Sequence, residues 1–371
     1  MKFICLQEHL AKSIGTVERA VAKTAHLPAL THILIEASEG RLRLAATDLE
    51  IGIVSWCQGK SEEDGRVTVP AKTVAGLIAT LQPEKLTLRS SGADCVLSGG
   101  ALSATLKGLP SDDFPLIPEI KNELPLTTDS ARLKQGLGRV IESAAPESTR
   151  PELGGILFGL GKDLLTLVAT DSFRLSIVTI PSLQTGGVSP LFFQDHGVII
   201  PGKTVRELTH LIDIEDPQLF ISVSENQIQF TQKNYRLVSR LIEGTYPRYE
   251  DIIPTTFLGE RLFNRRDLLS ALKRIEFFSG KMQRVELSLK ADECVISTED
   301  PFLGSASEKV KSEGQGPEKK IAFNIRYLLS GLATFTEDNI TLEYNESVAP
   351  VIFRSEETGR AMYIVMPMKL E

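Results

Sequence analysis

Three segments spread along the chain share one pattern, and this internal repeat constrains the fold more than any other feature. The segments are VTVPAKTVAGLIATL (67–81), VIIPGKTVRELTHLI (198–212) and IAFNIRYLLSGLATF (321–335). Each joins a short β-type run, a Pro or Asn and a basic residue to an apolar helical pattern, and Pro and Asn are favoured at helix starts. The anchors Pro70, Pro201 and Asn324 are 131 and 123 residues apart. A period this long indicates repeated domains rather than a solenoid.

A second helix is predicted ahead of each of these segments, over residues 7–23, 130–144 and 265–278, because apolar residues recur there at helical spacing. Short alternating runs broken by Gly, Asn and Asp lie between the helices and are typical of antiparallel strands. The sequence therefore predicts an α+β protein of three tandem homologous domains. We expect these repeats to span residues 1–122, 123–255 and 256–371.

Charge is distributed unevenly between the helices and the remainder of the chain. The six predicted helices carry fourteen Lys and Arg against six Asp and Glu, a net charge of +8, whereas the whole chain carries −7. Lys-rich helix surfaces are common, but a bias that recurs in every repeat of an acidic protein indicates a shared surface facing a polyanion. We find no Arg, Asn and Gln cluster suited to base edges, so the expected contact is with phosphates, independent of sequence.

The sequence gives little sign of catalytic, metal or cofactor chemistry. The four cysteines are scattered and are expected to be buried free thiols, and the five histidines lack metal-ligand spacing. Asp48 and Asp171 recur in two ATD segments; a catalytic carboxylate pair is conceivable, but fixing a strand-to-turn geometry is the better explanation. Residues 155–163 are expected to form turns, and residues 307–320 a solvated loop.

No apolar run approaches the length of a membrane span, and the N-terminus lacks a signal-peptide core. We therefore expect no contact with a membrane and a cytoplasmic location, associated with the nucleoid.

Several longer motifs occur in a specific order. They are LPAL (27–30), ATDLEIGI (46–53), VPAK (69–72), ATDSFRLS (169–176), YPRYEDIIP (246–254) and YIVMPMKL (363–370). Together they resemble the bacterial sliding clamp family, the beta subunits of DNA polymerase III, over essentially the whole chain. The resemblance implies domains of two helices backed by two small sheets, and a head-to-tail homodimer that encircles duplex DNA. It also implies a non-catalytic subunit that confers processivity by tethering a polymerase.

The resemblance further implies a pocket for short peptide motifs of the clamp loader, replicative and repair polymerases, ligase and mismatch-repair proteins. The matching positions are Thr170, Ser172, Arg174, Leu175, Pro247, Ile252, Val348, Pro350, Ile364, Met366, Pro367 and Met368. Met and Pro would give an adaptable apolar surface. Two alternatives stay open: Arg174 could pair within the sheet instead of orienting a peptide, and residues 364–368 could be a terminal core strand.

Two further sets of positions follow from the helix charges and the resemblance. The candidate DNA contacts are Lys72, Arg150, Lys203, Thr24, Lys12 and Arg139. The loop 146–152 (PESTRPE) lacks the aromatic residues common in the family, which makes stacking on single-stranded template doubtful. Phe277 and Phe278 are expected to contact Leu106 of the other subunit, with ordinary core packing as the alternative.

Two other functions are compatible with the sequence. One is a clamp-fold adaptor that binds partner peptides but is not productively loaded on DNA, motivated by Thr24 and the altered loop. The other is a nucleic-acid enzyme with an unrecognised active site, which the lack of clustered ligands disfavours.

Overall fold

The computed structural model describes residues 1–24, 26–121, 125–146, 150–161, 164–184, 197–346, 348–355 and 361–369. These residues contain six α-helices: α1 (Gln7–Val17), α2 (Ala71–Thr80), α3 (Ser130–Val140), α4 (Gly202–Leu211), α5 (Arg265–Glu276) and α6 (Ile325–Ala333). All six predicted helices are therefore present, two in each repeat. Each is shorter than predicted, in part because the final turn of α1 and α3 tightens into a 3₁₀ turn, Glu18–Ala20 and Ile141–Ser143.

The described chain forms two compact units, one of residues 1–131 and 206–241 and the other of residues 132–182, 197–205 and 242–369. The first unit has a five-stranded antiparallel sheet, in the order β5 (Gly59–Glu63), β1 (Lys2–Leu6), β7 (Lys85–Ser91), β8 (Asp94–Gly99) and β9 (Leu102–Leu106). Strand β9 pairs with β8 alone and is thus an edge strand among the described residues.

A longer antiparallel sheet in this first unit crosses from the first repeat into the second. Its order is β6 (Gly65–Pro70), β2 (His32–Ser38), β3 (Arg41–Thr47), β4 (Ile51–Cys57), β17 (Tyr235–Arg240), β16 (Gln227–Gln232), β15 (Gln218–Val223) and β10 (Leu126–Asp129). The join lies between β4 and β17, where Ile53 is opposite Leu237. Edge strands that would otherwise be open are thereby paired.

The second unit contains an equivalent long sheet, which joins the second repeat to the third. Its long sheet runs β14 (Val198–Pro201), β11 (Gly155–Leu160), β12 (Leu164–Thr170), β13 (Arg174–Gln184), β25 (Ala361–Val365), β24 (Val351–Ser355), β23 (Asn339–Tyr344) and β18 (Gly259–Asn264). The repeats join between β13 and β25, with Leu175 opposite Ile364. A second sheet has the order β22 (Lys319–Asn324), β19 (Arg284–Leu289), β20 (Glu293–Asp300) and β21 (Gly304–Gln315).

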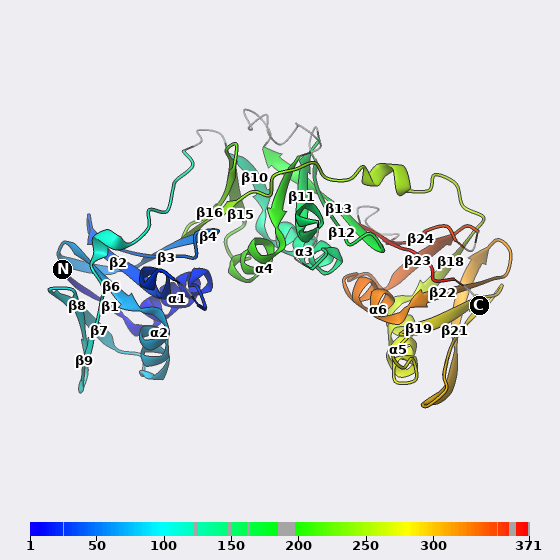
Figure 1. Ribbon diagram of the computed structural model, residues 1–371, viewed down its shortest axis with the longest axis horizontal. Helices are drawn as coiled ribbons and strands as arrows, with labels where there is room; N and C mark the ends of the chain where they lie inside the picture. The colour runs from blue at the N-terminus through cyan, green and yellow to red at the C-terminus, as the bar shows by residue number, and fades with distance from the viewer. Residues whose placement is uncertain are drawn as a thin grey trace. The chain divides into compact units, whose positions relative to one another are not determined.

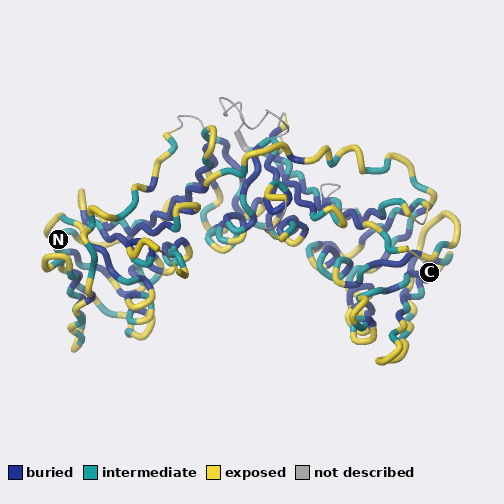
Figure 2. Tube along the Cα trace, viewed as in Figure 1, coloured by how far each residue is buried: buried dark blue, intermediate teal, exposed yellow. Residues whose placement is uncertain are grey.

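The helices pack in pairs through the apolar faces that the sequence predicted. Helices α1 and α2 lie beside each other, as do α5 and α6 (Figure 1). Leu10, Ile14 and Val17 of α1 are buried, whereas the opposite helix faces and the loops are exposed (Figure 2). Asn324 caps α6 as expected, because its side-chain oxygen accepts a hydrogen bond from the Arg326 amide.

Two sequence-based predictions of irregular structure are wrong. Most of residues 307–320 belongs to β21 and β22, because backbone pairing with β20 and β19 orders this polar segment, with Val310 as its buried anchor. Residues Gly155–Leu160 form strand β11. Gly155 is needed there since a Cβ would lie only 2.5 Å from Ile199 Cγ2. Residues 162 and 163 lie outside the described residues.

Candidate functional site

The two ATD segments form equivalent turns at the ends of β3 and β12. Asp48 Oδ1 accepts hydrogen bonds from the amides of Glu50 and Ile51, at 3.0 and 2.8 Å. Asp171 Oδ1 accepts from the amides of Phe173 and Arg174, both at 2.9 Å. These are Asx turns, so the prediction that the aspartates fix a strand-to-turn geometry is confirmed.

The turn at Asp171 also carries an ion pair. Arg174 Nε donates to Asp171 Oδ2 at 2.9 Å, and Nη1 donates to Ser330 Oγ of α6 at 2.5 Å. The guanidinium carbon also lies 4.7 Å from the centre of the Tyr327 ring, a cation–π contact. The Arg174 side chain is therefore engaged within the protein, which corresponds to the pairing alternative, and it links the second repeat to the third.

Two of the candidate peptide-pocket residues, Leu175 and Ile364, belong to one apolar cluster in the second unit. Leu175 and Ile364 are buried in its base, together with Leu157, Val168, Ile199, Tyr246 and Ile352. Ile252 directly precedes Ile253, which packs against this cluster, and Met366 follows Ile364 by two residues; both are exposed, as is Val348. A buried apolar base with exposed apolar side chains nearby is suited to side chains of a peptide.

The segment after β25 resolves the alternative of a terminal core strand. Ile364 is a core residue, but β25 ends at Val365. Beyond it the Met366 amide donates to the Phe173 carbonyl at 2.8 Å, and the Met368 amide donates to the Ala322 carbonyl at 2.7 Å. The backbone is thus held while the Met366, Pro367 and Met368 side chains keep partial exposure. Only the first part of this segment is core.

The other pocket candidates flank the cluster in different ways. Thr170 is buried and donates from Oγ1 to the Arg174 carbonyl at 2.7 Å, so it shapes the turn. Ser172 is exposed with φ of 76°, while Pro247 is exposed and Pro350 half-buried. Phe173 was not among the candidates, yet it is exposed and stacks on Tyr327 with ring centres 6.4 Å apart. Phe173 lies within a polar turn, so the sequence pattern did not mark it as a candidate pocket residue.

The candidate DNA contacts differ in how free their side chains are. Lys72 and Arg150 are exposed, Thr24 is exposed but uncharged, and Lys203 is half-buried with an interaction of its own. Residues 147–149 of the altered loop lie outside the described residues. Among the described residues, five exposed cations in or next to the helices have no ion-pair or hydrogen-bond partner for their side chains: Lys23, Lys72, Arg206, Lys273 and Arg326.

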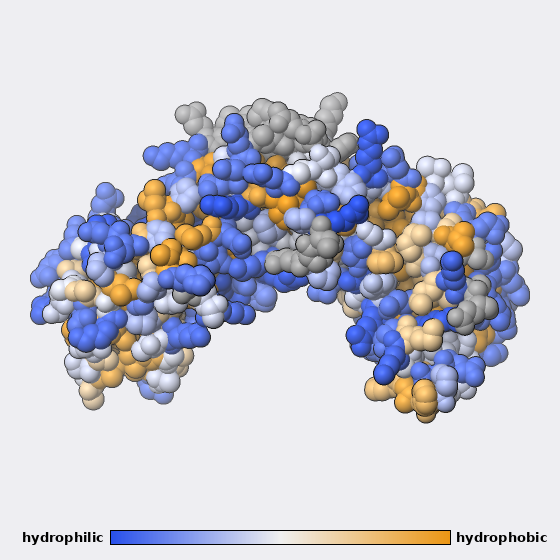
Figure 3. Space-filling model, viewed as in Figure 1, coloured by the Kyte–Doolittle hydropathy of each residue, from blue (hydrophilic) through white to orange (hydrophobic). Residues whose placement is uncertain are grey.

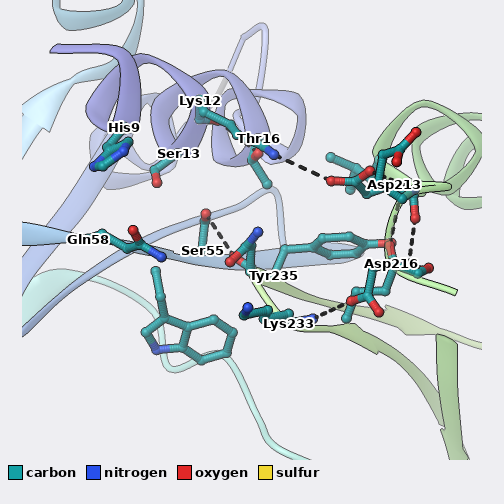
Figure 4. A pocket seen from close by; sticks show the side chains of 15 residues that line it. His9, Lys12, Ser13, Thr16, Ser55, Gln58, Asp213, Asp216, Lys233 and Tyr235 are labelled. Carbon is teal, nitrogen blue, oxygen red and sulfur yellow. Dashed lines mark hydrogen bonds and ion pairs between the residues drawn. The ribbon is translucent and has the colours of Figure 1, made fainter. Parts of the chain in front are cut away.

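Lys12 lines a cavity of about 390 Å³ in the first unit, shown in Figure 4. Its Nζ lies 3.4 Å from Asp213 Oδ2, and both side chains are partly exposed. Asp216 and the buried Tyr235 line the same cavity. Since exposed ion pairs contribute little, Lys12 can exchange Asp213 for another anion at small cost.

Arg139 is not available for a phosphate, which makes it the one candidate that the structure disfavours. Its guanidinium is buried and donates to both carboxylate oxygens of Glu337, at 2.9 and 3.0 Å, and to Thr336 Oγ1 at 2.9 Å. The charge is neutralised within the protein. Helical position alone could not reveal this because Glu337 is 198 residues away.

Comparison with known protein families covers all three repeats. The models for the DNA polymerase III beta subunit match residues 1–118 as its N-terminal domain, 127–248 as its central domain and 250–369 as its C-terminal domain. The chain belongs to this family. Members are non-catalytic clamp subunits and processivity factors of DNA polymerase III, which confirms the function, the replication role and the three-domain fold inferred from the motifs.

Individual relatives agree over full length. The beta sliding clamp of Synechocystis sp. is 30% identical over 389 residues, and that of Escherichia coli K12 is 29% identical over 375 residues, each alignment covering all of both chains. Among solved structures, the DNA polymerase sliding clamp of Bacillus subtilis superposes with a TM-score of 0.94 at 25% identity. The beta subunit of Pseudomonas aeruginosa superposes with a TM-score of 0.93 at 26% identity, and both cover all of both chains.

The candidate dimer residues of this clamp subunit occupy strand edges and surface. Leu106 is buried at the end of the edge strand β9. Phe277 directly follows α5 and is 80% exposed, and Phe278 is also exposed. Ordinary core packing is therefore wrong for this pair.

The described His, Cys, Asp and Glu residues of the clamp subunit form no cluster suited to a metal centre. All four cysteines are buried and free, as expected. Burial raises the pKa of the Cys95 thiol to about 11 and that of Cys294 to about 12, which disfavours the reactive thiolate. Among the described residues there is no group of three or more His, Cys, Asp or Glu placed to hold a metal ion. No helix in the described ranges is long and apolar enough to cross a membrane.

Proposed function

We propose that two copies of this clamp subunit close head to tail into a ring around duplex DNA and slide along it. The ring would hold the polymerase at the primer end, and an ATP-driven clamp loader would open it. The full-length match of all three repeats to the beta subunit family carries the proposal. The exposed, unpaired cations in each of the three repeats support it.

Topological tethering explains why weak contacts suffice. A polymerase bound to a closed ring stays at high effective concentration near the DNA without a tight DNA contact. Diffuse attraction between helix cations and phosphates has no sequence preference and permits sliding. The remainder of the chain is acidic and would repel DNA from other surfaces.

The proposed DNA contacts are Lys72, Lys203, Arg150, Lys12 and the hydroxyl of Thr24. Their exposure supports Lys72 and Arg150 most directly. We add Arg206, Lys273 and Arg326, because each is an exposed helix cation without a partner among the described residues. Arg139 is excluded because of its buried pair with Glu337.

The apolar cluster around Leu175 and Ile364 is the proposed binding site for partner peptides. Replicative and repair polymerases, the clamp loader, ligase and mismatch-repair proteins would share it in turn. Exposed Met366, Ile252 and Val348 could adjust to different apolar side chains. Binding to an array of overlapping peptides that cover the sequence of the cognate polymerase tests this proposal. Met366→Ala should lower the affinity for the peptides that bind wild type. Leu116→Ala, which changes an exposed leucine of the first repeat, should leave that affinity unchanged.

For the dimer we propose pairing between two open strand edges. Within the described residues, β9 pairs only with β8, and residues 304–311 of β21 pair only with β20. Pairing β9 of one copy with β21 of the next would satisfy both edges, and such a heterologous contact closes into a ring when the rotation permits. Leu106, Phe277 and Phe278 would lie at this contact.

The proposed domain boundaries remain 1–122, 123–255 and 256–371, and the proposed location is the cytoplasm, at the nucleoid.

Retention on circular DNA tests the proposal. The purified protein is loaded on nicked circular DNA by a cognate clamp loader with ATP, and the circle is then cut. Retention on the circle and loss from linear ends is expected for a sliding ring. Failure to load, with a loader active on another clamp and with a confirmed dimer, would instead favour a peptide-binding adaptor.

A further inference from the structure

We propose that the tip of the β20–β21 hairpin is an apolar anchor that docks on a second copy of this chain and determines how tightly the ring closes. The tip consists of Phe302 and Leu303, next to Met282. The inference rests on the head-to-tail dimer proposed above and extends it. In this inference, most of the binding free energy between the two copies comes from side chains that lie outside the paired strand edges.

The tip displays large apolar side chains on an ordered turn. Phe302 is 95% exposed, and Leu303 and Met282 are also exposed. Asp300 Oδ1 accepts hydrogen bonds from the amides of Phe302 and Leu303, at 2.9 and 3.0 Å, so the backbone of the tip is fixed. Holding two apolar side chains in water on a fixed turn has no benefit for the folding of one chain. Exposed apolar groups of this kind mark interaction sites.

The tip is continuous with the Phe277–Phe278 surface. A Cβ on Gly280 would lie 1.8 Å from Asp300 Oδ2, so the turn after α5 touches the base of the tip. Met282 and Pro301 line one shared cavity of about 570 Å³. Figure 3 shows hydrophobic side chains gathered at this end of the third repeat, over the hairpin tip. The five large apolar side chains at this end are Phe277, Phe278, Met282, Phe302 and Leu303.

The neighbouring strand edge identifies a second copy as the occupant. The tip directly precedes residues 304–311 of β21, the edge that has no second partner among the described residues. If that edge pairs antiparallel with β9 of another copy, as the described strands pair within this chain, the tip is carried onto the first repeat of that copy at the Leu106 end of β9. Five large apolar side chains could bury roughly 600 Å², close to the ~800 Å² per partner of a stable interface.

Analytical ultracentrifugation of the full chain over a dilution series tests the anchor. Phe302→Ser should raise the dimer dissociation constant about tenfold or more, since central aromatic anchors dominate interfaces. Leu116→Ser provides the matched control, because Leu116 is 92% exposed but belongs to none of the described strands. Its dissociation constant should stay within about twofold of wild type. Because Phe302 makes so little contact within its own chain, the thermal unfolding of the monomer should not change.

The outcomes separate the anchor from the ring itself. An unchanged dissociation constant for Phe302→Ser, with a weakened dimer in Phe277→Ser, would overturn the anchor and leave the proposed ring standing. A wild-type chain that stays monomeric at every concentration would overturn both. As a second readout, a photo-crosslinker at position 302 should attach to residues 95–107 of the other copy. Attachment elsewhere, to another face or to a different protein, would contradict the proposal.

Discussion

Arg139 and Glu337 form a buried ion pair that joins the second repeat to the third, with Nη2 at 2.9 and 3.0 Å from the two carboxylate oxygens. Their side chains are only 8% and 5% exposed. The guanidinium also lies 5.7 Å from the centre of the Phe335 ring. These contacts fasten α3 to the segment that follows α6. A cation that the charge pattern suggested for DNA thus holds two domains together.

Removing one partner of this pair should destabilise the second unit strongly. Arg139→Met leaves the Glu337 carboxylate buried with backbone hydrogen bonds but without this positive charge, and we expect a loss of about 3–5 kcal/mol in unfolding free energy. The double change with Glu337→Met should cost less than the sum of the single changes, because no unpaired charge remains. Urea unfolding followed by circular dichroism measures both.

Asp338, which directly follows Glu337, forms an exposed ion pair that serves as the control. Arg266 pairs with Asp338 at 3.3 Å, with side chains 74% and 65% exposed. Arg266→Met should therefore change the unfolding free energy by about 1 kcal/mol or less. Equal losses for Arg139→Met and Arg266→Met would show that the Arg139 pair contributes no more than a surface contact.

The same pair should make stability depend on pH in the acid range. Burial raises the pKa of Glu337, but hydrogen bonds from Arg139 and from the backbone outweigh it and hold the pKa below its usual value of 4.5. With a folded-state pKa below the unfolded one, the contribution is present above about pH 4.5 and is lost as the pH falls through the lower value. Melting temperatures measured from pH 7 to pH 3 should fall less steeply for Glu337→Gln than for wild type. Parallel curves would contradict this assignment.

The sequence predicted local structure well, because local structure depends on neighbours in the chain. The helix starts, the apolar helix faces and the turns at Asp48 and Asp171 all follow from residues within four positions of each other. The partner of Arg139 is 198 residues away, and the strand character of residues 307–315 depends on pairing with β20. Neither dependence has a local signature. The sequence did not predict that Phe173 and Phe302 are exposed, because exposure also depends on residues distant in the chain.

The two Asx turns provide a matched comparison within one molecule. Both Asp48→Ala and Asp171→Ala remove two hydrogen bonds from backbone amides, and Asp171→Ala removes in addition the ion pair with Arg174. We expect the ion pair with Arg174 to account for about 2 kcal/mol of the unfolding free energy lost in Asp171→Ala, since a hydrogen bond between charged groups is worth about that much. Only Asp171→Ala should weaken peptide binding, because its turn borders Leu175. Thermal unfolding and the peptide array report the two effects.

An unfolding free energy of Arg174→Met equal to that of wild type would mean that the Arg174 pair adds nothing beyond the turn. Arg174→Met distinguishes the two causes, since it keeps the Asx turn and removes the contacts to Asp171, Ser330 and Tyr327. If these side-chain contacts position the peptide site, Arg174→Met should reduce peptide affinity as much as Asp171→Ala does.

The last prediction concerns the helix cations and the salt dependence of DNA binding. Each phosphate contact lowers the slope of log affinity against log salt concentration by about 0.9 on duplex DNA. Lys72→Ala, Lys273→Ala and Arg326→Ala should each make the slope shallower by roughly that amount, independently of DNA sequence. Fluorescence anisotropy with labelled duplex at several NaCl concentrations measures the slope. Lys311→Ala is the control, because Lys311 is an exposed cation that pairs with Glu313 on β21 and lies on no helix. A slope altered equally by Lys311→Ala would mean that net charge, not the helix surface, governs the attraction to DNA.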